Sequence, residues 1–516
     1  MRNPADKACH NCRRRRLKCD RDVPACRKCA LTGQDCLGYG KLFVWNEGVA
    51  SRGKMMGKTY PVPARDTDSV NTRSLIPAQV HYSEVFLPLQ QPLLDPLYQG
   101  LDDTSRGYLS HFASTVSSDM VIANISDVNP FRSLIPFCRD HPILLHIILA
   151  NSALHISCLH RRRLDGPEEH MPGLATGELS TTDAADRASR AMVDALSAKH
   201  KALILLRHAL EDMSHIDVDM VAAVVHLFII FELISPGEDE WKAHVEGALR
   251  LISYLHTLEI RHASPAALVR DCVTSDCLTY YILGSSLMNT TTLSDPFLLP
   301  GDIIASLTRA EVTSYLSLPT PLLQTLFKAC ELSNRVSLGE MLGADPTPLL
   351  NQANDLLNTV QSFDVYAWAA TLEGGDPFSA RTLSRIHTAL AHQNAVRIYI
   401  LRSVEQISPS PVAGLCETES LVTEIVTHLS LVGLTDPIFK ATSWPTFIAG
   451  AETDDVVYRE WAVTRLREFW NLIPWGYLRT EEEVMRKAWR LRDGQGERKM
   501  SWIQQLKGME RHWLIA

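Results

Sequence analysis

The stretch CHNCRRRRLKCDRDVPACRKCALTGQDC, residues 9–36, decides the fold of the N-terminal part of this chain. Its cysteines follow the pattern C-x2-C-x6-C twice, and six residues separate the two halves. The stretch is therefore an internal repeat in which each half offers three thiolates. The cysteines, in chain order, are Cys9, Cys12, Cys19, Cys26, Cys29 and Cys36.

The number of thiolates predicts a shared metal cluster. Sulfur is the preferred donor in structural zinc sites, and a tetrahedral zinc ion takes four ligands. Six thiolates are too many for one zinc ion and too few for two, unless two sulfurs each bridge both ions. In a twofold repeat the bridging sulfurs should be equivalent, which favours the first cysteine of each half, Cys9 and Cys26. We therefore expect two Zn²⁺ ions, each completed by the other two cysteines of one half.

The two halves differ in charge between their second and third cysteines. The first half carries a basic run without Gly or Pro, fit for one or two helical turns, whereas the second half carries no Lys or Arg there. Arginine pairs with phosphates and can donate two hydrogen bonds to guanine in the major groove. The first half is therefore predicted to face double-stranded DNA, through Arg13, Arg14, Arg15, Arg16 and Lys18.

This pattern, with Pro24 between the halves, resembles the Zn2Cys6 binuclear cluster of fungal transcription factors. The resemblance implies that the first and fourth cysteines bridge the metals, in agreement with the symmetry of the repeat. It also implies that Arg15 and Arg16, three and four positions after the second cysteine, contact a CGG-type triplet. Many family members have Lys at these two positions. Lys18 is expected to contact phosphate.

The cysteine-rich stretch has three other interpretations. Two are weaker, and the third is compatible with DNA binding. A disulfide framework requires an oxidising compartment, whereas residues 1–7 show no apolar signal sequence. A zinc module used only for protein contacts leaves four consecutive arginines unexplained. The arginine run could also be a nuclear import signal, which agrees with DNA binding and with an expected location in the nucleus.

Charge is distributed unevenly along the 516 residues. The whole chain has a formal net charge of −8, and residues 1–40 contain ten Lys and Arg against four Asp and Glu, a net of +6. Subtracting +6 from −8 leaves −14 for the remaining residues. The N-terminal part is basic and the rest of the chain is acidic, which indicates that nucleic acid binds to the N-terminal part only.

The other cysteines and the apolar runs are typical of an intracellular globular protein. We expect the longest apolar run to be residues 220–233, which is shorter than a membrane span requires, so no membrane partner is expected. The remaining cysteines are scattered in apolar surroundings, as reduced core cysteines are. They are Cys138, Cys158, Cys272, Cys277, Cys330 and Cys416.

Residues 41–84 are predicted to be a linker, because their Gly, Pro and polar residues cannot build a core. No heptad follows the cysteines. We therefore expect the cysteine-rich part to bind one triplet as a monomer, and any homo-oligomer to form through the helical region or a partner. Residues 42–58 resemble the linker of acriflavine-sensitivity-control type regulators. The basic residues here could follow phosphates or be incidental to a solvated linker: Lys41, Arg52, Lys54 and Lys58.

Beyond about residue 100 the chain is predicted to be helical, since period-two alternation is nowhere sustained. The predicted helices cover residues 104–116, 141–162, 188–213, 218–233, 238–256, 265–287, 321–342, 347–372, 380–406, 419–431, 454–472 and 481–491. Gly247, inside one of them, predicts the close approach of a neighbouring helix.

The helical region resembles the regulatory domain that follows the cluster in many fungal factors. Three local matches carry this resemblance, at residues 144–155, 241–248 and 444–450. The expected architecture is a small N-terminal Zn2Cys6 binuclear zinc module and a large all-α regulatory domain joined by a linker. The expected boundaries are 5–40 for the Zn2Cys6 DNA-binding domain, 41–84 for the linker and 85–516 for the all-α fungal transcription factor regulatory domain.

The sequence shows no catalytic motif that would favour an enzyme over this interpretation. The chain has no His-Glu-x-x-His, Gly-x-Ser-x-Gly or Walker pattern, so we predict that it is not an enzyme. His146 and His155, in an apolar helix, are interpreted as structural.

The predicted function is that of a sequence-specific, DNA-binding transcription factor that regulates RNA polymerase II genes together with the transcription machinery. The subgroup resemblance favours genes of a secondary-metabolite cluster or of toxic-compound resistance. The alternative is a ligand-sensing or interaction protein whose zinc module gives only non-specific affinity for nucleic acid.

Overall fold

The chain forms two compact units, Met1–Leu89 and Gln90–Ala516. The structure is a computed structural model that describes residues 7–22, 25–32, 36, 96–122, 129–165, 181–211, 217–236, 240–257, 267–289, 295–298, 303–343, 345–372, 379–407, 411–493, 501–509 and 511–516. The predicted linker, residues 41–84, lies outside the described residues. The described part of the first unit, residues 7–36 with gaps, is called the cysteine module below, and Gln90–Ala516 is called the helical body.

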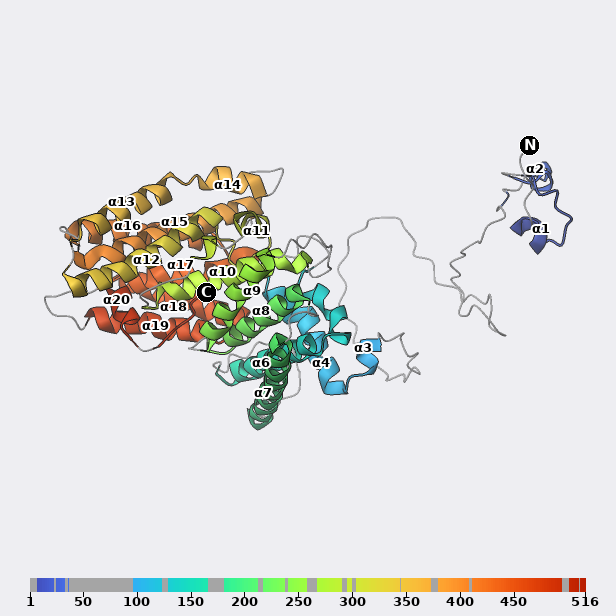
Figure 1. Cartoon of the computed structure of the whole chain (residues 1–516), viewed down its shortest axis with the longest axis horizontal. Helices are drawn as coiled ribbons and strands as arrows, with labels where there is room; N and C mark the ends of the chain where they lie inside the picture. Colours follow the sequence, from blue (N-terminus) through green and yellow to red (C-terminus); the bar gives the residue numbers. More distant parts are fainter. Residues whose placement is uncertain are drawn as a thin grey trace, which may run out of the picture. The chain divides into compact units, whose positions relative to one another are not determined.

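The cysteine module contains two one-turn helices (Figure 1), α1 (His10–Arg14) and α2 (Arg27–Leu31). Each begins directly after the first cysteine of its half-repeat, so the repeat in the sequence is a repeat in the structure. The predicted basic helix is thus present, although it is short.

The helical body contains no β-strand among its described residues, in agreement with the predicted all-α fold. The first half of the body contains α3 (Pro96–Gln99), α4 (Asp103–His111), η1 (Phe112–Val116), α5 (Ser117–Asp119), η2 (Arg132–Arg139), α6 (Pro142–Asp165), α7 (Thr181–Glu211), α8 (Val218–Ile234), α9 (Trp241–Thr257), α10 (Ala267–Ser286), η4 (Pro296–Leu298) and α11 (Ile303–Ala310). The second half contains α12 (Thr320–Leu342), α13 (Thr347–Ser362), α14 (Val365–Leu372), α15 (Ala380–Val404), η5 (Glu405–Ile407), α16 (Pro411–Ser430), η6 (Pro437–Thr442), α17 (Ser443–Glu452), α18 (Val456–Leu472), α19 (Tyr477–Asp493) and α20 (Trp502–Lys507).

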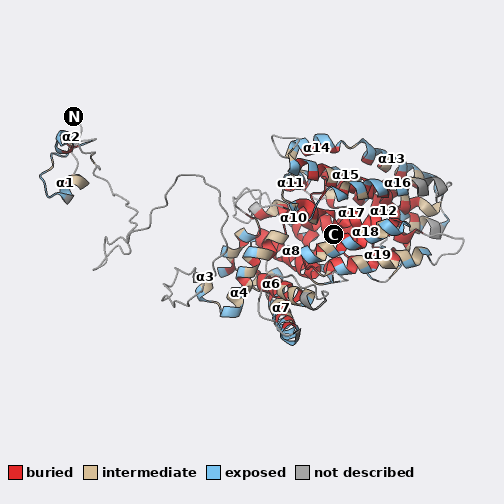
Figure 2. Ribbon diagram, turned by 180° about the vertical axis from the view of Figure 1, so that it is seen from behind, coloured by how far each residue is buried: buried red, intermediate tan, exposed pale blue. Residues whose placement is uncertain are grey.

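Helix α8 lies entirely inside the helical body, and all 17 of its residues are buried. A helix that is apolar on every side must be surrounded by other helices. Helices α6, α9 and α10 pack around α8, and the buried residues form a continuous interior (Figure 2). The Asp217 side chain caps α8 by accepting hydrogen bonds from the backbone N–H groups of Asp219 and Met220, which fixes where the helix begins.

Several predicted helix boundaries differ from the structure. The predicted helix 347–372 is two helices, α13 and α14, because Asp364 Oδ1 accepts hydrogen bonds from the N–H groups of Tyr366 and Ala367 and so starts a new helix. Helices α7 and α16 begin seven and eight residues earlier than the predicted starts at residues 188 and 419. The polar first turn of α7, Thr181-Thr182-Asp183, hid its start from a prediction based on apolar periodicity; the start of α16 is apolar, at Pro411-Val412-Ala413, and was overlooked.

The prediction for Gly247 was wrong, because no atom lies within 4 Å of the place where its Cβ would be. Two other glycines allow helices to approach closely. A Cβ at Gly284 of α10 would lie 2.0 Å from Cη2 of Trp241 on α9, and a Cβ at Gly450 of α17 would lie 2.4 Å from Sδ of Met485 on α19. The contact between these helices therefore requires glycine at positions 284 and 450.

One helix, α6, is long and apolar enough to cross a membrane by length and composition alone. The apolar segment is Pro142–Arg162, and 67% of its most apolar window is buried inside the helical body. Core helices of globular domains have the same composition and the same burial. Helix α6 is therefore packed as a core helix. The prediction that residues 220–233 are the longest apolar run overlooked this segment.

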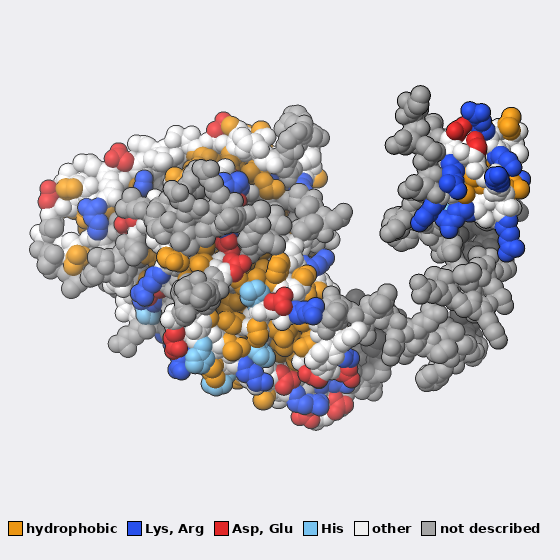
Figure 3. Space-filling model, turned by 45° about the vertical axis from the view of Figure 1, so that its right-hand side comes forward, with side chains coloured by type: hydrophobic (Ala, Val, Ile, Leu, Met, Phe, Trp, Pro, Cys, Tyr) orange, Lys and Arg blue, Asp and Glu red, His pale blue; other side chains and the backbone are white. Residues whose placement is uncertain are grey.

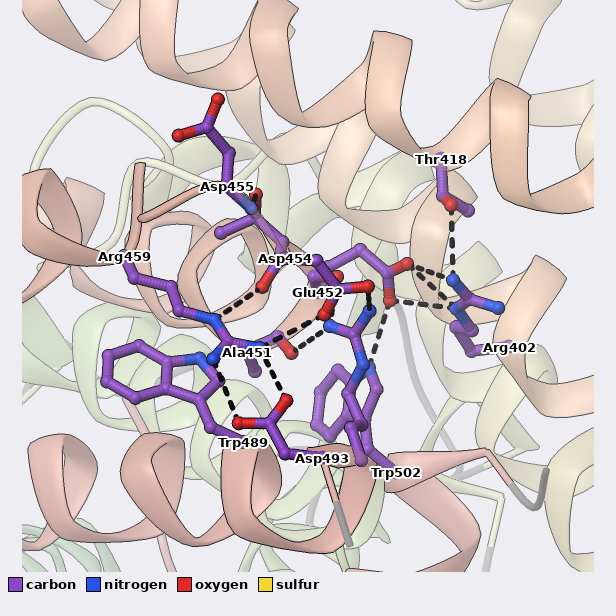
Figure 4. A network of polar contacts seen from close by, with 12 residues as sticks. Arg402, Thr418, Ala451, Glu452, Asp454, Asp455, Arg459, Trp489, Asp493 and Trp502 are labelled. Atoms are coloured by element: carbon purple, nitrogen blue, oxygen red, sulfur yellow. Dashed lines mark hydrogen bonds and ion pairs between the residues drawn. The ribbon is translucent and has the colours of Figure 1, made fainter. Parts of the chain in front are cut away.

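A buried ion pair joins α15 to α17 in the second half of the body (Figure 4). The Arg402 Nε group donates to both carboxylate oxygens of Glu452, at 2.9 and 2.8 Å. The indole N–H of Trp502 donates to the same carboxylate at 3.0 Å, and Arg402 also donates to Thr418 at 3.2 Å. The network links four helices, because Thr418 lies on α16 and Trp502 on α20.

Removing the carboxylate should be strongly destabilising, because Arg402 would remain buried without its main counter-charge. We expect Glu452→Ala to lower the free energy of unfolding by about 3–5 kcal/mol, measured by guanidinium denaturation at pH 7. The exposed Glu460 offers a matched control, since Glu460→Ala removes a carboxylate from the surface of the next helix. A loss below about 1 kcal/mol, the value of a surface pair, would contradict this role.

The contribution of Glu452 should also depend on pH. Burial opposes ionisation, but the hydrogen bonds and charge of Arg402 outweigh it and hold the pKa of Glu452 below its usual value. The folded pKa is therefore lower than the unfolded pKa, which is about 4.3 for Glu. The stabilisation is present above the unfolded pKa and is lost as the pH falls through the folded pKa.

Candidate metal centre and nucleic-acid interface

Both helices of the cysteine module begin at a cysteine. Cys9 is the N-cap of α1, and its sulfur accepts a hydrogen bond from the Cys12 N–H at 3.4 Å. Cys26 is the N-cap of α2, and its sulfur accepts from the Cys29 N–H at 3.4 Å. The positive end of each helix dipole thus faces a sulfur, which favours the thiolate that a metal needs.

The six predicted cysteines come together as two overlapping groups of four sulfurs. Within each group all the sulfurs lie within 4.8 Å of one another. Cys9 and Cys26 belong to both groups, as the symmetry of the repeat predicts for a bridging pair. The first group is Cys9, Cys12, Cys19 and Cys26, and the second is Cys9, Cys26, Cys29 and Cys36.

The distances between sulfurs suit tetrahedral zinc. The Sγ atoms of Cys9 and Cys26 are 3.6 Å apart, and Cys9–Cys29 and Cys12–Cys26 are each separated by 3.8 Å. A zinc–sulfur bond of about 2.3 Å places the corners of a tetrahedron about 3.8 Å apart. No disulfide joins the cysteines that the structure describes. The donor set therefore fits two zinc ions whose tetrahedra share one edge.

Burial favours the protonated form of the central thiols. Burial raises the pKa of the Cys9, Cys12 and Cys26 thiols above the ordinary value of 9.0. Zinc must displace these protons, because the metal binds thiolate and not thiol. The affinity of the module for zinc should therefore fall as the pH falls.

Helix α1 ends in a Schellman motif that places Arg16 in an unusual conformation. The Leu17 N–H donates to the Cys12 carbonyl at 2.9 Å, and the Arg16 N–H donates to the Arg13 carbonyl at 3.3 Å. Arg16 has a φ of 53°, the left-handed position that glycine usually takes in this motif. A non-glycine residue at this place is strained, and the chain turns sharply after the C-cap residue Arg15.

The exposed cations of the first half form one basic cluster around the end of α1. This basic cluster consists of Arg13, Arg15, Arg16 and Lys18. Side chains of Lys and Arg cover much of the module surface in the space-filling view (Figure 3). The side chain of Arg14, the fifth predicted contact, lies outside the described atoms.

In the second half of the module, a cation is paired with carboxylates. The Arg27 Nε group donates to Asp22 at 2.7 Å, and the Arg27 N–H donates to Asp20 at 2.8 Å. The two carboxylates thus neutralise a cation and hold the start of α2. This role of Asp20 and Asp22 was not predicted, although an acidic pair beside the third cysteine is visible in the sequence.

The comparison with protein families agrees with this geometry. The model of the fungal Zn(2)-Cys(6) binuclear cluster domain matches residues 7–43, and that of the fungal specific transcription factor domain matches residues 107–516. The chain belongs to the fungal Zn(2)-Cys(6) transcription factors. This membership confirms the predicted fold class and the two zinc ions of the family's cluster. It also confirms the prediction that the chain is a transcription factor and not an enzyme.

Relatives within the family extend over different parts of the chain. The acriflavine sensitivity control protein acr-2 of Neurospora crassa is 30% identical over 598 residues, which cover 99% of this chain and 97% of the relative. The sterol uptake control protein 2 of Candida albicans is 41% identical over 71 residues, 13% of this chain and 10% of the relative. No solved structure matches the chain. The predicted resemblance to acriflavine-sensitivity-control regulators is confirmed.

Loss of a shared cysteine should affect both metal ions. In Cys26→Ala, three sulfurs would remain for each zinc ion, so we expect both ions to be lost on dialysis against a weak chelator. In Cys36→Ala, one group of four sulfurs remains intact, so one zinc ion should be retained. Metal analysis of the full chain measures the ratio. Equal zinc content in the two variants would show that Cys26 is not shared.

The strain at Arg16 should appear as a gain on substitution by glycine. We expect Arg16→Gly to stabilise the folded module by about 1 kcal/mol, since glycine adopts a positive φ without penalty. The readout is the chelator concentration that removes half of the zinc. Arg16→Ala, which loses the charge but keeps a Cβ, is the control and should bring no gain. Equal behaviour of the two variants would contradict a strained helix end.

Proposed function

We propose that this transcription factor is nuclear, binds DNA sequence-specifically and regulates RNA polymerase II genes. The observation that carries the proposal is the basic cluster, whose four cations are exposed around the end of α1. The second half has fewer exposed cations, since Arg27 is ion-paired with Asp22 and Lys28 is the other cation of α2. The first half-repeat therefore offers a polyanion the larger basic surface.

We further propose that all six cysteines are zinc ligands and that Cys9 and Cys26 bridge the two ions. The two overlapping groups of sulfurs support this assignment. Each zinc ion would be completed by the second and third cysteines of one half. Bound zinc supplies the positive charge that keeps the thiolates together, while the protein residues determine the direction in which α1 points.

Within the basic cluster, we assign base contacts to Arg15 and Arg16 and a phosphate contact to Lys18. Arg15 is the C-cap of a five-residue helix and Arg16 follows it. An α-helix with its side chains is about 10–12 Å across, and the major groove, about 12 Å wide, admits one. The end of α1 can therefore enter the groove. Arginine pairs best with guanine, which agrees with a CGG-type triplet, and Arg14 is included as a contact on its sequence position alone.

The regulated pathway is proposed from the relatives. The name of acr-2 links that protein to acriflavine sensitivity, which favours control of toxic-compound resistance for this chain. A secondary-metabolite cluster is the second candidate. The residues after 40 carry a net charge of −14, which disfavours contact with DNA and suits protein partners such as the transcription machinery.

Substitutions in the basic cluster should separate base contacts from phosphate contacts. We expect Arg15→Ala or Arg16→Ala to weaken binding to a CGG-bearing duplex by about 1–3 kcal/mol and to relax the base preference. Lys18→Ala should weaken binding to all sequences alike. The measurement is fluorescence anisotropy of the full chain on CGG-bearing and scrambled duplexes at one salt concentration.

The control for this measurement is Lys28→Ala, which removes an exposed cation from the second half and should leave the base preference unchanged. Equal losses on both duplexes for Arg15→Ala and Arg16→Ala would remove these residues from base contact. If the unmodified protein bound both duplexes equally, the alternative of an interaction or ligand-sensing protein with non-specific affinity would be favoured.

A further inference from the structure

A pocket of about 340 Å³ lies in the helical body, where the C-terminal end of α8 meets α6 and α19. Its volume lies within the range of small-molecule sites in proteins. Helices α6, α7, α8, α18 and α19 all contribute to its lining. An occupant of this pocket therefore touches helices from the first and the second half of the body.

Most of the side chains that line the pocket are apolar. Leu154 and Ile234 are buried, Met192 is half-buried, and the Trp470 side chain also lines the pocket. Apolar walls of this kind hold the body of an organic molecule by removing its surface from water. The polar groups of the pocket then determine which kind of molecule is accepted.

Two backbone carbonyls at the end of α8 already have donors. The Ile234 carbonyl accepts a hydrogen bond from the Gly476 N–H at 2.9 Å and one from the Cys158 thiol at 3.6 Å. The Pro236 carbonyl accepts from the Thr480 hydroxyl at 2.6 Å. These carbonyls therefore need no donor from an occupant.

Two arginines line the pocket, Arg161 of α6 and Arg479 of α19. The Arg161 side chain is exposed and has no hydrogen bond or ion pair with any residue in the described part of the helical body. The Arg479 guanidinium lies over the ring of Trp470, 4.4 Å from its centroid. Arg161 thus offers the pocket a cation whose donors are available.

Both guanidinium groups act on the same buried atom. Burial raises the pKa of the Cys158 thiol to about 11, and the positive charges of Arg161 and Arg479 oppose this rise. Interactions between charges weaken with distance, so both cations lie near the thiol. Cys158 therefore marks the part of the pocket where two positive charges converge.

One carboxylate also lines the pocket, that of Glu483, one helical turn after Arg479. Glu483 is exposed, and its charge is not among those that act on Cys158. Exposed charges interact weakly because water and salt screen them. The pocket therefore has two positive charges near its buried thiol and one negative charge at its exposed rim.

We propose that this pocket is a binding site for a small aromatic carboxylic acid in its ionised form. Its carboxylate is held by Arg161 and Arg479, since planar guanidinium groups donate paired hydrogen bonds to carboxylates. Its ring packs against Leu154 and Ile234. A flat ring is favoured because the indole of Trp470 and the guanidinium of Arg479 present flat faces.

The proposed site connects the acid to the stability of the helical body. A molecule that binds the folded chain and not the unfolded chain stabilises the fold by mass action. Because the occupant contacts α6 and α7 as well as α18 and α19, it stabilises the contact between the two halves of the body. The site goes beyond the proposed function, because it requires none of the proposed DNA contacts.

Isothermal titration calorimetry of the zinc-bound full chain at pH 7, without DNA, tests the site. The probes are naphthalene-1-acetate and its neutral amide, naphthalene-1-acetamide, which share a ring system and differ in charge. We expect the acid to bind with a dissociation constant on the order of 100 μM and the amide to bind about tenfold more weakly. Equal binding of the two probes, or no binding of the acid at millimolar concentration, would overturn the proposal.

Variants place the binding in this pocket. Arg161→Gln should weaken binding of the acid about tenfold and leave the amide unchanged, because it removes a charge and keeps a polar side chain. Arg250→Gln, at an exposed arginine of α9 outside the pocket, is the control and should change neither probe. Trp470→Leu should weaken both probes, and thermal unfolding without probe checks that each variant is folded. Equal effects of Arg161→Gln and Arg250→Gln would contradict the proposed position.

The carboxylate at the rim gives an independent test of the charge of the occupant. Glu483→Gln should strengthen binding of the acid about twofold, because it removes an exposed like charge, and should not change binding of the amide. Weaker binding of the acid would contradict an anionic occupant. The affinity of each variant for the CGG-bearing duplex should equal that of the unmodified chain, so failure of this site and failure of the proposed function are distinguishable.

Discussion

The contact between the sulfurs of Cys9 and Cys26, 3.6 Å apart, is the constraint on which the cysteine module depends. The buried cluster of the module consists of four cysteines, with Cys19 and Cys36 packed against it. So few residues bury too little apolar surface to fold alone, so metal–sulfur bonds must replace the core. Because Cys9 and Cys26 are also the N-caps of α1 and α2, any metal that they share fixes the two helices relative to each other.

Within the cysteine module, the sequence predicted the features that follow from the number and spacing of the cysteines. The spacings predicted a two-metal cluster, its symmetry and the basic helix after the second cysteine. It was not sufficient for Arg16, because arginine rarely adopts a positive φ and nothing in the basic run marks the end of α1. The pairing of Arg27 with Asp22 was likewise hidden, since it depends on how the loop between the halves folds.

In the helical body, the sequence predicted the all-α class and a helix at residues 218–233, which the structure shows as the buried helix α8. The sequence did not predict the features that depend on contacts between helices. Gly247 and Gly284 look alike in the sequence, but only Gly284 faces a ring of another helix. Helix α7 shows the same difficulty: Leu206 is buried and Leu203 is exposed, although both are leucines on an apolar part of one helix. Which of them faces α6 depends on packing and not on residue type.

The proposed bridging of two metals by Cys9 and Cys26 can be tested directly. Cadmium-113 NMR of the cadmium-substituted protein measures the couplings between each cadmium and the β-protons of its cysteine ligands. We predict two cadmium resonances, with Cys9 and Cys26 coupled to both and every other cysteine of the module coupled to one. A single resonance, or two resonances with no cysteine in common, would contradict the claim.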